Sequence, residues 1–335
     1  MTDWLTTPIP ELCLALRGDE FPLSDYVALL ERQIREEEPQ VRAFLDEPKR
    51  FERLQHEARA LVERHPDRRR RPPLFGLPAG VKDIFHVDGF LTRAGSRLPP
   101  EALAGPQAEC VTQLVEAGAL VLGKTVTTEF AYFAPGATRN PRNLEHTPGG
   151  SSSGSAAAVA AGMAPLALGT QTIGSVIRPA SFCGVVGFKP TYGRVSTHGV
   201  IPLSPSLDHV GWFARDVAGI MAAARVLCRG WNPNAPPSRP RFGIPQGPYL
   251  ARADESAHRV LEAAVGVLRR AGYDVKAVSV MRDFEAIARN HQTILAAEVA
   301  RVHRAWFRDY ANLYHARTAE LILAGQAIDD STLRE

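Results

Sequence analysis

Residues 10–65 repeat apolar positions with the period of an α-helix among many charged positions, in segments such as DYVALLERQIREEEP and FERLQHEARALVERH. This spacing places the apolar side chains on one face of each helix. The pattern stops at the proline-flanked stretch 66–73. We therefore predict an N-terminal helical layer over residues 1–66 and a basic, proline-containing linker over residues 67–73.

From Leu74 onward, short apolar runs alternate with helix-like stretches, as in GLPAGVKDIF, ECVTQLVEAGALVLGKT and SAAAVAAGMAPLALGT. Such alternation favours an α/β core with a largely buried sheet. An amphipathic helix is predicted to begin near residue 255 and to end at Gly272, where the strand YDVKAVSV follows. The last fifty residues again have a helical pattern. The core is predicted to occupy residues 74–335.

Composition narrows the classes of function. With 45% hydrophobic and 22% charged residues, the chain has the make-up of an ordinary globular protein. The basic run Arg68–Arg71 lacks interleaved aromatic residues, so it is interpreted as a solvated connector and no nucleic-acid partner is expected. The four cysteines have neither metal-ligand spacing nor the density of a disulfide framework.

The N-terminus has no basic segment followed by an apolar one, and no stretch approaches eighteen uninterrupted apolar residues. We expect no membrane partner and, by default, a cytoplasmic location.

Two short motifs match nucleotide-binding and hydrolase patterns but stand in the wrong context. Gly118–Thr125 fits the phosphate-loop pattern, yet its central residues form an apolar run that favours a buried strand. Gly150–Gly154 fits the G-x-S-x-G elbow, which requires a preceding strand, whereas RNPRNLEHTP precedes it here. Neither nucleotide binding nor the elbow is predicted.

The stretch GGSSSGSAAAVAAG, followed by GTQTIGSVIRPASFCGVVGFKPTYG, resembles the amidase signature. The segments GLPAGVKDIF and SPSLDHVGWFARDV extend the resemblance over roughly residues 70–230. The resemblance implies an amidase-signature fold, in which helices cover both faces of a mixed, mostly buried central β-sheet. Family members usually run about a hundred residues longer, so we expect this chain to be truncated at its C-terminus.

The resemblance also implies the catalytic residues. The family's catalytic lysine maps onto Lys82, its bridging serine, after a cis peptide bond, onto Ser151, and its nucleophile onto Ser175. A serine hydroxyl needs a base during attack. Lysine can serve if burial lowers its pKa by roughly 3 units, worth about 4 kcal/mol. A negative charge on Asp83 would oppose this lowering of the Lys82 pKa if the side chain pointed inward, so we expect Asp83 to point away from Lys82.

Lysine is rare in this chain, with five lysines against thirty-four arginines. Arginine cannot release a proton near neutral pH, so it could not replace lysine at position 82 if that residue acts as a base. Lys124 and Lys189 are interpreted as structural.

The backbone N–H groups of Thr172, Ile173, Gly174 and Ser175 are the predicted oxyanion hole. Ile173 stands where the family usually has glycine. Either the turn keeps a negative φ at Ile173 or the hole is reshaped.

Arg178 follows the mapped nucleophile by three residues. If a helix begins at Ser175, its guanidinium returns to the same face, where it would bind a substrate carboxylate. The alternative is a structural partner, such as Asp208 or a backbone carbonyl.

The predicted function is hydrolysis of a small-molecule carboxylic amide through an acyl-serine, releasing ammonia or an amine, with no metal or organic cofactor. Homodimer formation is left open. One alternative is the ammonia-producing glutaminase subunit of a tRNA-dependent amidotransferase, although its loop usually carries an aspartate and two glycines where this chain has Gln171–Gly174. Another is a non-catalytic scaffold that retains the signature.

Overall fold

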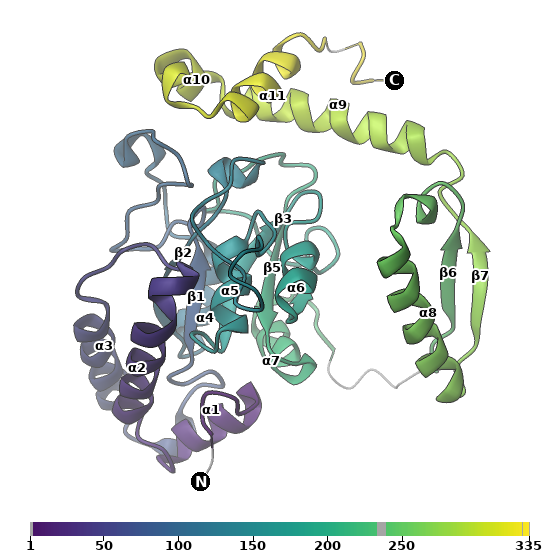
Figure 1. Cartoon of the computed structure of the whole chain (residues 1–335). Helices are drawn as coiled ribbons and strands as arrows, with labels where there is room; N and C mark the ends of the chain where they lie inside the picture. The colour runs from purple at the N-terminus through teal and green to yellow at the C-terminus, as the bar shows by residue number, and fades with distance from the viewer. Residues whose placement is uncertain (1–2, 233–238, 330, 335) are drawn as a thin grey trace.

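The computed structural model describes residues 3–232, 239–329 and 331–334, and a five-stranded mixed sheet lies at its centre (Figure 1). Its strands are β1 (Pro78–Lys82), β2 (Leu120–Thr125), β3 (Leu166–Gln171), β4 (Val186–Phe188) and β5 (His209–Ala214), in the order β2-β1-β3-β5-β4. Strand β1 pairs in parallel with β2 and β3, and β5 pairs antiparallel with β3 and β4. The sheet is mixed, as the resemblance implies.

Helices cover both faces of this sheet, which confirms the predicted fold class. Those before residue 232 are α1 (Ile9–Gly18), α2 (Leu23–Val41), α3 (Arg50–Arg64), α4 (Glu109–Glu116), α5 (Ser153–Ala160), α6 (Ile177–Cys183) and α7 (Val217–Leu227). Helix α5 is built from small residues, mainly alanine, serine and glycine, and packs against β1 and β3. A Cβ at Gly154 would lie 2.2 Å from the carbonyl oxygen of Ala43, so only glycine allows this approach.

The predicted linker is partly structural. Arg68–Arg70 form an exposed 3₁₀ turn, as expected of a solvated connector. Arg71, in contrast, is buried, pairs with Asp19 and stacks over the Phe75 ring at 4.4 Å from its centroid. The interpretation as a connector is therefore wrong for Arg71, because its guanidinium joins the end of α1 to the core.

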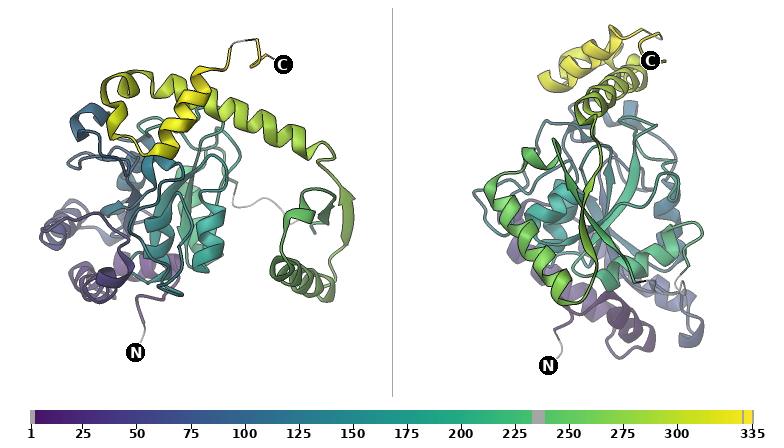
Figure 2. Two further views of the ribbon diagram at one scale, coloured as in Figure 1. Left: turned by 45° about the horizontal axis from the view of Figure 1, so that its top comes forward. Right: turned by 90° about the vertical axis from the view of Figure 1, so that its right-hand side faces the viewer.

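The C-terminal part adds a small α/β unit and a layer of helices. Strands β6 (Phe242–Gln246) and β7 (Val275–Ser279) pair in parallel, with the predicted helix, α8 (Glu255–Arg270), connecting them. The helices α9 (Phe284–Val302), α10 (Arg304–Tyr310) and α11 (Ala316–Gln326) follow. Figures 1 and 2 show α9 spanning from the β6-β7-α8 unit to the end of the five-stranded sheet that α10 and α11 cover.

The structure also agrees with the expectation that the phosphate-loop and G-x-S-x-G patterns lack their usual structural context. The apolar run inside Gly118–Thr125 is strand β2, not an open phosphate loop. The residues before Gly150 form loops, not a strand. In the part of the chain that the structure describes, no helix has both the length and the apolar character needed to cross a membrane.

Candidate active site

The predicted catalytic residues come from neighbouring elements whose ends meet at one edge of the sheet. Lys82 ends β1, Thr170 lies at the end of β3, and Ser151 precedes α5. Because β1 and β3 run in parallel, their carboxyl ends lie side by side. Lys82 Nζ donates to Ser151 Oγ at 2.8 Å and to Thr170 Oγ1 at 2.7 Å. The Gly150–Ser151 peptide bond is cis, as the resemblance implies.

Lys82 is completely buried, and its surroundings favour the neutral amine. Burial lowers the pKa of Lys82 to about 7, and the negative charge of Asp208 acts in the opposite direction. A substantial fraction of Lys82 is therefore neutral near pH 7 and able to accept a proton.

Asp83 points away from Lys82, as expected. Its carboxylate pairs with Lys124 Nζ at 2.8 Å. Lys124 Nζ also donates to the Phe85 carbonyl at 2.8 Å and to Thr92 Oγ1 at 3.1 Å. Lys124 is thus held by structural contacts, and Lys189 likewise donates to the Pro190 carbonyl at 2.9 Å.

Ser175 lies two residues before α6 and is 6% exposed. Its carbonyl oxygen accepts a hydrogen bond of 3.4 Å from the Ser152 N–H, which ties the two serine loops together. Within residues 3–232, neither Ser151 Oγ nor any other group forms a hydrogen bond with the Ser175 hydroxyl. The structure therefore joins Lys82 to Ser151, while the Ser175 hydroxyl has no hydrogen bond among these residues.

The turn before Ser175 accommodates Ile173 without a left-handed backbone. Ile173 is not among the residues with positive φ in the described chain, and 42% of it is exposed. Of the two alternatives for this position, the turn takes the ordinary φ. The side chain therefore projects outward without the steric cost of a β-branched residue at positive φ.

Gln171 caps α6 through its side chain. Its Oε1 accepts hydrogen bonds from the N–H groups of Val176 and Ile177, each at 3.0 Å. Sequence analysis missed this role, because glutamine six residues before a helix is not a recognised capping signal.

Asp208 also has a larger role than its motif indicated. Its Oδ1 accepts from Thr172 Oγ1 at 2.5 Å, and its Oδ2 accepts from the N–H groups of Leu203 and Ser204 at 2.8 and 3.0 Å. Burial raises the pKa of Asp208 to about 6, and these hydrogen bonds and the nearby Lys82 act to lower it.

Arg178 contacts a backbone carbonyl and not Asp208. Its Nε and Nη2 both donate to the carbonyl oxygen of Gly150, at 3.1 and 2.8 Å. These bonds hold the residue that precedes Ser151. This arrangement is the backbone-carbonyl alternative of the sequence analysis.

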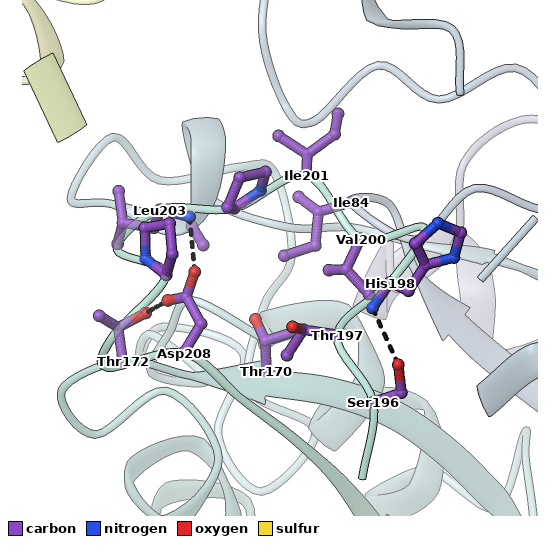
Figure 3. A pocket seen from close by; sticks show the side chains of 13 residues that line it. Ile84, Thr170, Thr172, Ser196, Thr197, His198, Val200, Ile201, Leu203 and Asp208 are labelled. Carbon is purple, nitrogen blue, oxygen red and sulfur yellow. Dashed lines mark hydrogen bonds between the residues drawn. The ribbon is translucent and has the colours of Figure 1, made fainter. Parts of the chain in front are cut away.

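A cavity of about 420 Å³ borders this group (Figure 3). Figure 3 shows the Asp208 carboxylate between Thr172 and Leu203, with Thr170 beside it. Thr170 lines the cavity and also binds Lys82, so one residue separates the cavity from the lysine–serine pair, which does not line it. The lining residues are Ile84, Ala131, Thr170, Thr172, Ser196, Thr197, His198, Val200, Ile201, Pro202, Leu203, Pro205 and Asp208.

Comparisons with known proteins agree on one family. The family model described as Amidase matches residues 26–324. The chain is 39% identical over 306 residues to a glutamyl-tRNA(Gln) amidotransferase subunit of Roseiflexus castenholzii, covering 82% of this chain and 61% of that protein. The same amidotransferase subunit from Koribacter versatilis is 52% identical over 152 residues, 44% of this chain and 32% of that one.

Two solved structures of similar fold have titles that name an amidase. One titled "Crystal structure of amidase" superposes with a TM-score of 0.88 at 32% identity, covering 98% of this chain and 76% of that one. The peptide amidase from Stenotrophomonas maltophilia gives a TM-score of 0.82 at 29% identity, with 98% and 78% covered. The chain spans about 60% of the length of the first curated relatives that it matches.

Proposed function

The chain belongs to the amidase family, and from that premise we propose that it hydrolyses a carboxylic amide through an acyl ester of Ser175, with release of ammonia or an amine. The observation that supports this most strongly is the 2.8 Å hydrogen bond between Lys82 Nζ and Ser151 Oγ at a fully buried site. A lysine whose pKa is about 7 is a usable base near neutral pH.

In the proposed first half-reaction, Ser175 Oγ attacks the amide carbon. Its proton passes to Ser151 Oγ, which gives its own proton to neutral Lys82. The negative charge that develops on the substrate oxygen is bound by backbone N–H groups of the turn at Thr172, Ile173, Gly174 and Ser175. The relay then returns a proton to the leaving nitrogen, the carbon–nitrogen bond breaks, and acyl-Ser175 remains.

In the second half-reaction, water attacks acyl-Ser175 and loses a proton to the same relay. The ester bond breaks, Ser175 regains its proton, and the carboxylic acid leaves. Both half-reactions require Ser151 Oγ and Ser175 Oγ to come within hydrogen-bonding distance when substrate binds. Catalytic hydrogen bonds of this kind often shorten only in the enzyme–substrate complex.

We extend the proposal to Arg178. Two of its nitrogens bind the Gly150 carbonyl, and Nη1 makes no hydrogen bond within the described residues. Arg178 borders a second cavity, of about 280 Å³, together with Gly149 and Gly150. A substrate carboxylate in that cavity would pair with Nη1, so amides of dicarboxylic acids are the preferred substrates in this proposal.

A second candidate is the ammonia-producing subunit of an amidotransferase that acts on glutamyl-tRNA(Gln). The names of the curated relatives favour it over a free-standing amidase. In this case the amide would be that of glutamine, and the ammonia would pass to a partner protein. The Gln171–Gly174 loop, which departs from the usual aspartate and two glycines, argues in the other direction.

A fluorophosphonate probe tests the shared chemistry, because it labels only an activated serine. We expect labelling of the wild-type protein and of Ser24→Ala, a control at an exposed serine of α2, and none of Ser175→Ala. Mass spectrometry should place the label on Ser175. Undiminished labelling of Ser175→Ala would refute the nucleophile assignment, and an unlabelled wild-type protein would favour the scaffold alternative.

Turnover of a substrate panel separates the two candidates. Faster hydrolysis of glutamine than of any other primary amide would favour the amidotransferase candidate. Faster hydrolysis of dicarboxylic monoamides that lack an α-amino group, such as succinamate, than of both glutamine and neutral primary amides would favour the amidase with Arg178 as carboxylate ligand.

A further inference from the structure

Glu298 of α9 connects the C-terminal helices to the wall of the larger cavity. Its Oε2 accepts a hydrogen bond from Ser204 Oγ at 2.5 Å and another from the Ser206 N–H at 3.1 Å. Ser204 is completely buried, and the neighbouring Leu203 and Pro205 line the cavity. Figure 2 shows that α9 lies outside the five-stranded sheet, so this contact crosses from one layer of the fold to another.

The same loop also binds Asp208. The N–H groups of Leu203 and Ser204 donate to one carboxylate oxygen, and the Thr172 hydroxyl donates to the other. Both oxygens of Asp208 are thus occupied, one by the cavity loop and one by the turn that leads to Ser175. A continuous path of hydrogen bonds runs from Glu298 through Ser204 and Asp208 to Thr172.

We propose that Glu298 and Asp208 are positioning residues that hold the turn Thr172–Gly174 in the orientation that binds the developing oxyanion. The proposal rests on the proposed function, because it presumes that this turn faces the substrate carbonyl. The physical reason is that backbone donors stabilise the transition state only where they are already aligned, and a displacement of about 1 Å can cost on the order of a hundredfold in rate.

Three substitutions test the path by kinetics, and Glu285→Ala serves as the matched control. Glu285 lies on the same helix, thirteen positions before Glu298, where it pairs with Arg252 at 2.7 Å in an exposed ion pair. Glu298→Ala should lower kcat about tenfold with KM changed less than twofold, since the loss falls on the transition state. Glu298→Gln should recover most of the rate, because its amide oxygen still accepts from Ser204 Oγ.

Asp208→Asn should lose more, about a hundredfold in kcat. If the Asn oxygen keeps the Thr172 bond, its NH₂ group faces the N–H donors of Leu203 and Ser204. Glu285→Ala should match the wild-type protein. Equal kcat for Glu298→Ala and Glu285→Ala would overturn the role of Glu298.

A double-variant cycle tests whether the two ends of the path act together. Thr172→Val removes the hydroxyl that binds Asp208 and keeps the backbone N–H. If the path acts as one unit, the variant with both Glu298→Ala and Thr172→Val should lose little more kcat than the worse single variant. Multiplicative losses would overturn the coupling.

Hydrogen exchange followed by mass spectrometry provides a readout that needs no turnover. In Glu298→Ala, peptides covering residues 172–175 and 203–206 should exchange faster, while peptides of β1 and α2 should be unchanged. Unchanged exchange at 172–175, or faster exchange spread through the whole chain, would overturn the proposal. Absence of amide hydrolysis in the wild-type protein would instead refute the proposed function, so the two failures are distinguishable.

Discussion

Lys82 and Asp208 are two buried groups of opposite charge near the candidate site, and Asp208 also lines the larger cavity. Burial disfavours the charged form of each, lowering the pKa of Lys82 to about 7 and raising the pKa of Asp208 to about 6, while their mutual attraction opposes both shifts. Near pH 7 the pair therefore combines a lysine that can accept a proton with an aspartate that is still largely ionised. This combination suits a general base beside a fixed acceptor of hydrogen bonds.

The pH dependence of turnover follows from the pKa of Lys82. Because the neutral amine of Lys82 is the proposed base, kcat/KM should be low under acidic conditions and rise with a midpoint near pH 7. Lys82→Arg should lose activity by several orders of magnitude at every pH from about 6 to about 9, because guanidinium stays protonated. A rising limb found only above about pH 10 would mean that Lys82 is not the base or is not desolvated.

At the scale of elements, the start of α6 determines where Ser175 lies. The helix has seven residues, and Ser175 stands just before it. Its first N–H groups at Val176 and Ile177 receive their acceptor from Gln171, at the end of β3. Strand, turn and helix are thereby joined into one unit that carries Ser175, the proposed nucleophile.

Replacing Gln171 tests that unit. Gln171→Ala leaves the buried Val176 N–H without its acceptor, so we expect a loss of roughly 1–3 kcal/mol in the free energy of unfolding and slower labelling of Ser175 by fluorophosphonate. Gln171→Asp should lose less unfolding free energy and less of the labelling rate, because a carboxylate is a favourable acceptor at a helix N-terminus. Urea titration and labelling rates measure the two effects. Equal loss in both variants would argue against a capping role.

At the scale of the whole molecule, a buried aromatic cluster fastens the C-terminal helices to the core. His303, between α9 and α10, has its Nδ1 at 2.9 Å from the Tyr314 hydroxyl and its ring centroid 4.6 Å from that of Phe130. Phe130 lies in the buried 3₁₀ turn Glu129–Ala131, whose last residue, Ala131, lines the larger cavity. Burial lowers the pKa of His303 to about 3, so the folded protein keeps this imidazole neutral.

Stability should therefore decline in acid because of His303. Its pKa is lower in the folded state than the ordinary value of 6.5, so the unfolded chain binds the extra proton between about pH 6.5 and 3 and stability falls as pH decreases through that range. At about pH 5 the lowered pKa of His303 reduces the free energy of unfolding by about 2 kcal/mol relative to neutral pH.

His303→Gln, which keeps a partner for the Tyr314 hydroxyl but cannot titrate, should weaken this dependence. Denaturant unfolding at about pH 5 and about pH 7.5 measures it, and the difference between wild type and variant removes the contributions of other histidines. An unchanged slope in the variant would show that His303 protonates outside this range.

The amino-acid sequence by itself determined the elements and the residues that carry the proposed chemistry. Helical and strand periodicity predicted the N-terminal helices, the α/β core and the α8–β7 pair, because these patterns are local and repeat along the chain. The signature segments indicated Lys82, Ser151 and Ser175, the two serines in glycine-rich loops of distinctive composition.

Only the tertiary structure decided which groups hold those residues in place. Thr172 and Asp208 are 36 positions apart in the chain, Lys82 and Thr170 are 88 apart, and Ser204 and Glu298 are 94 apart. No local pattern marks such partners, because a threonine, an aspartate or a glutamate has the same neighbours in sequence whether it faces solvent or a buried donor. Their hydrogen bonds exist only because the packing of the sheet, the cavity loop and α9 brings distant segments together in a place from which water is excluded.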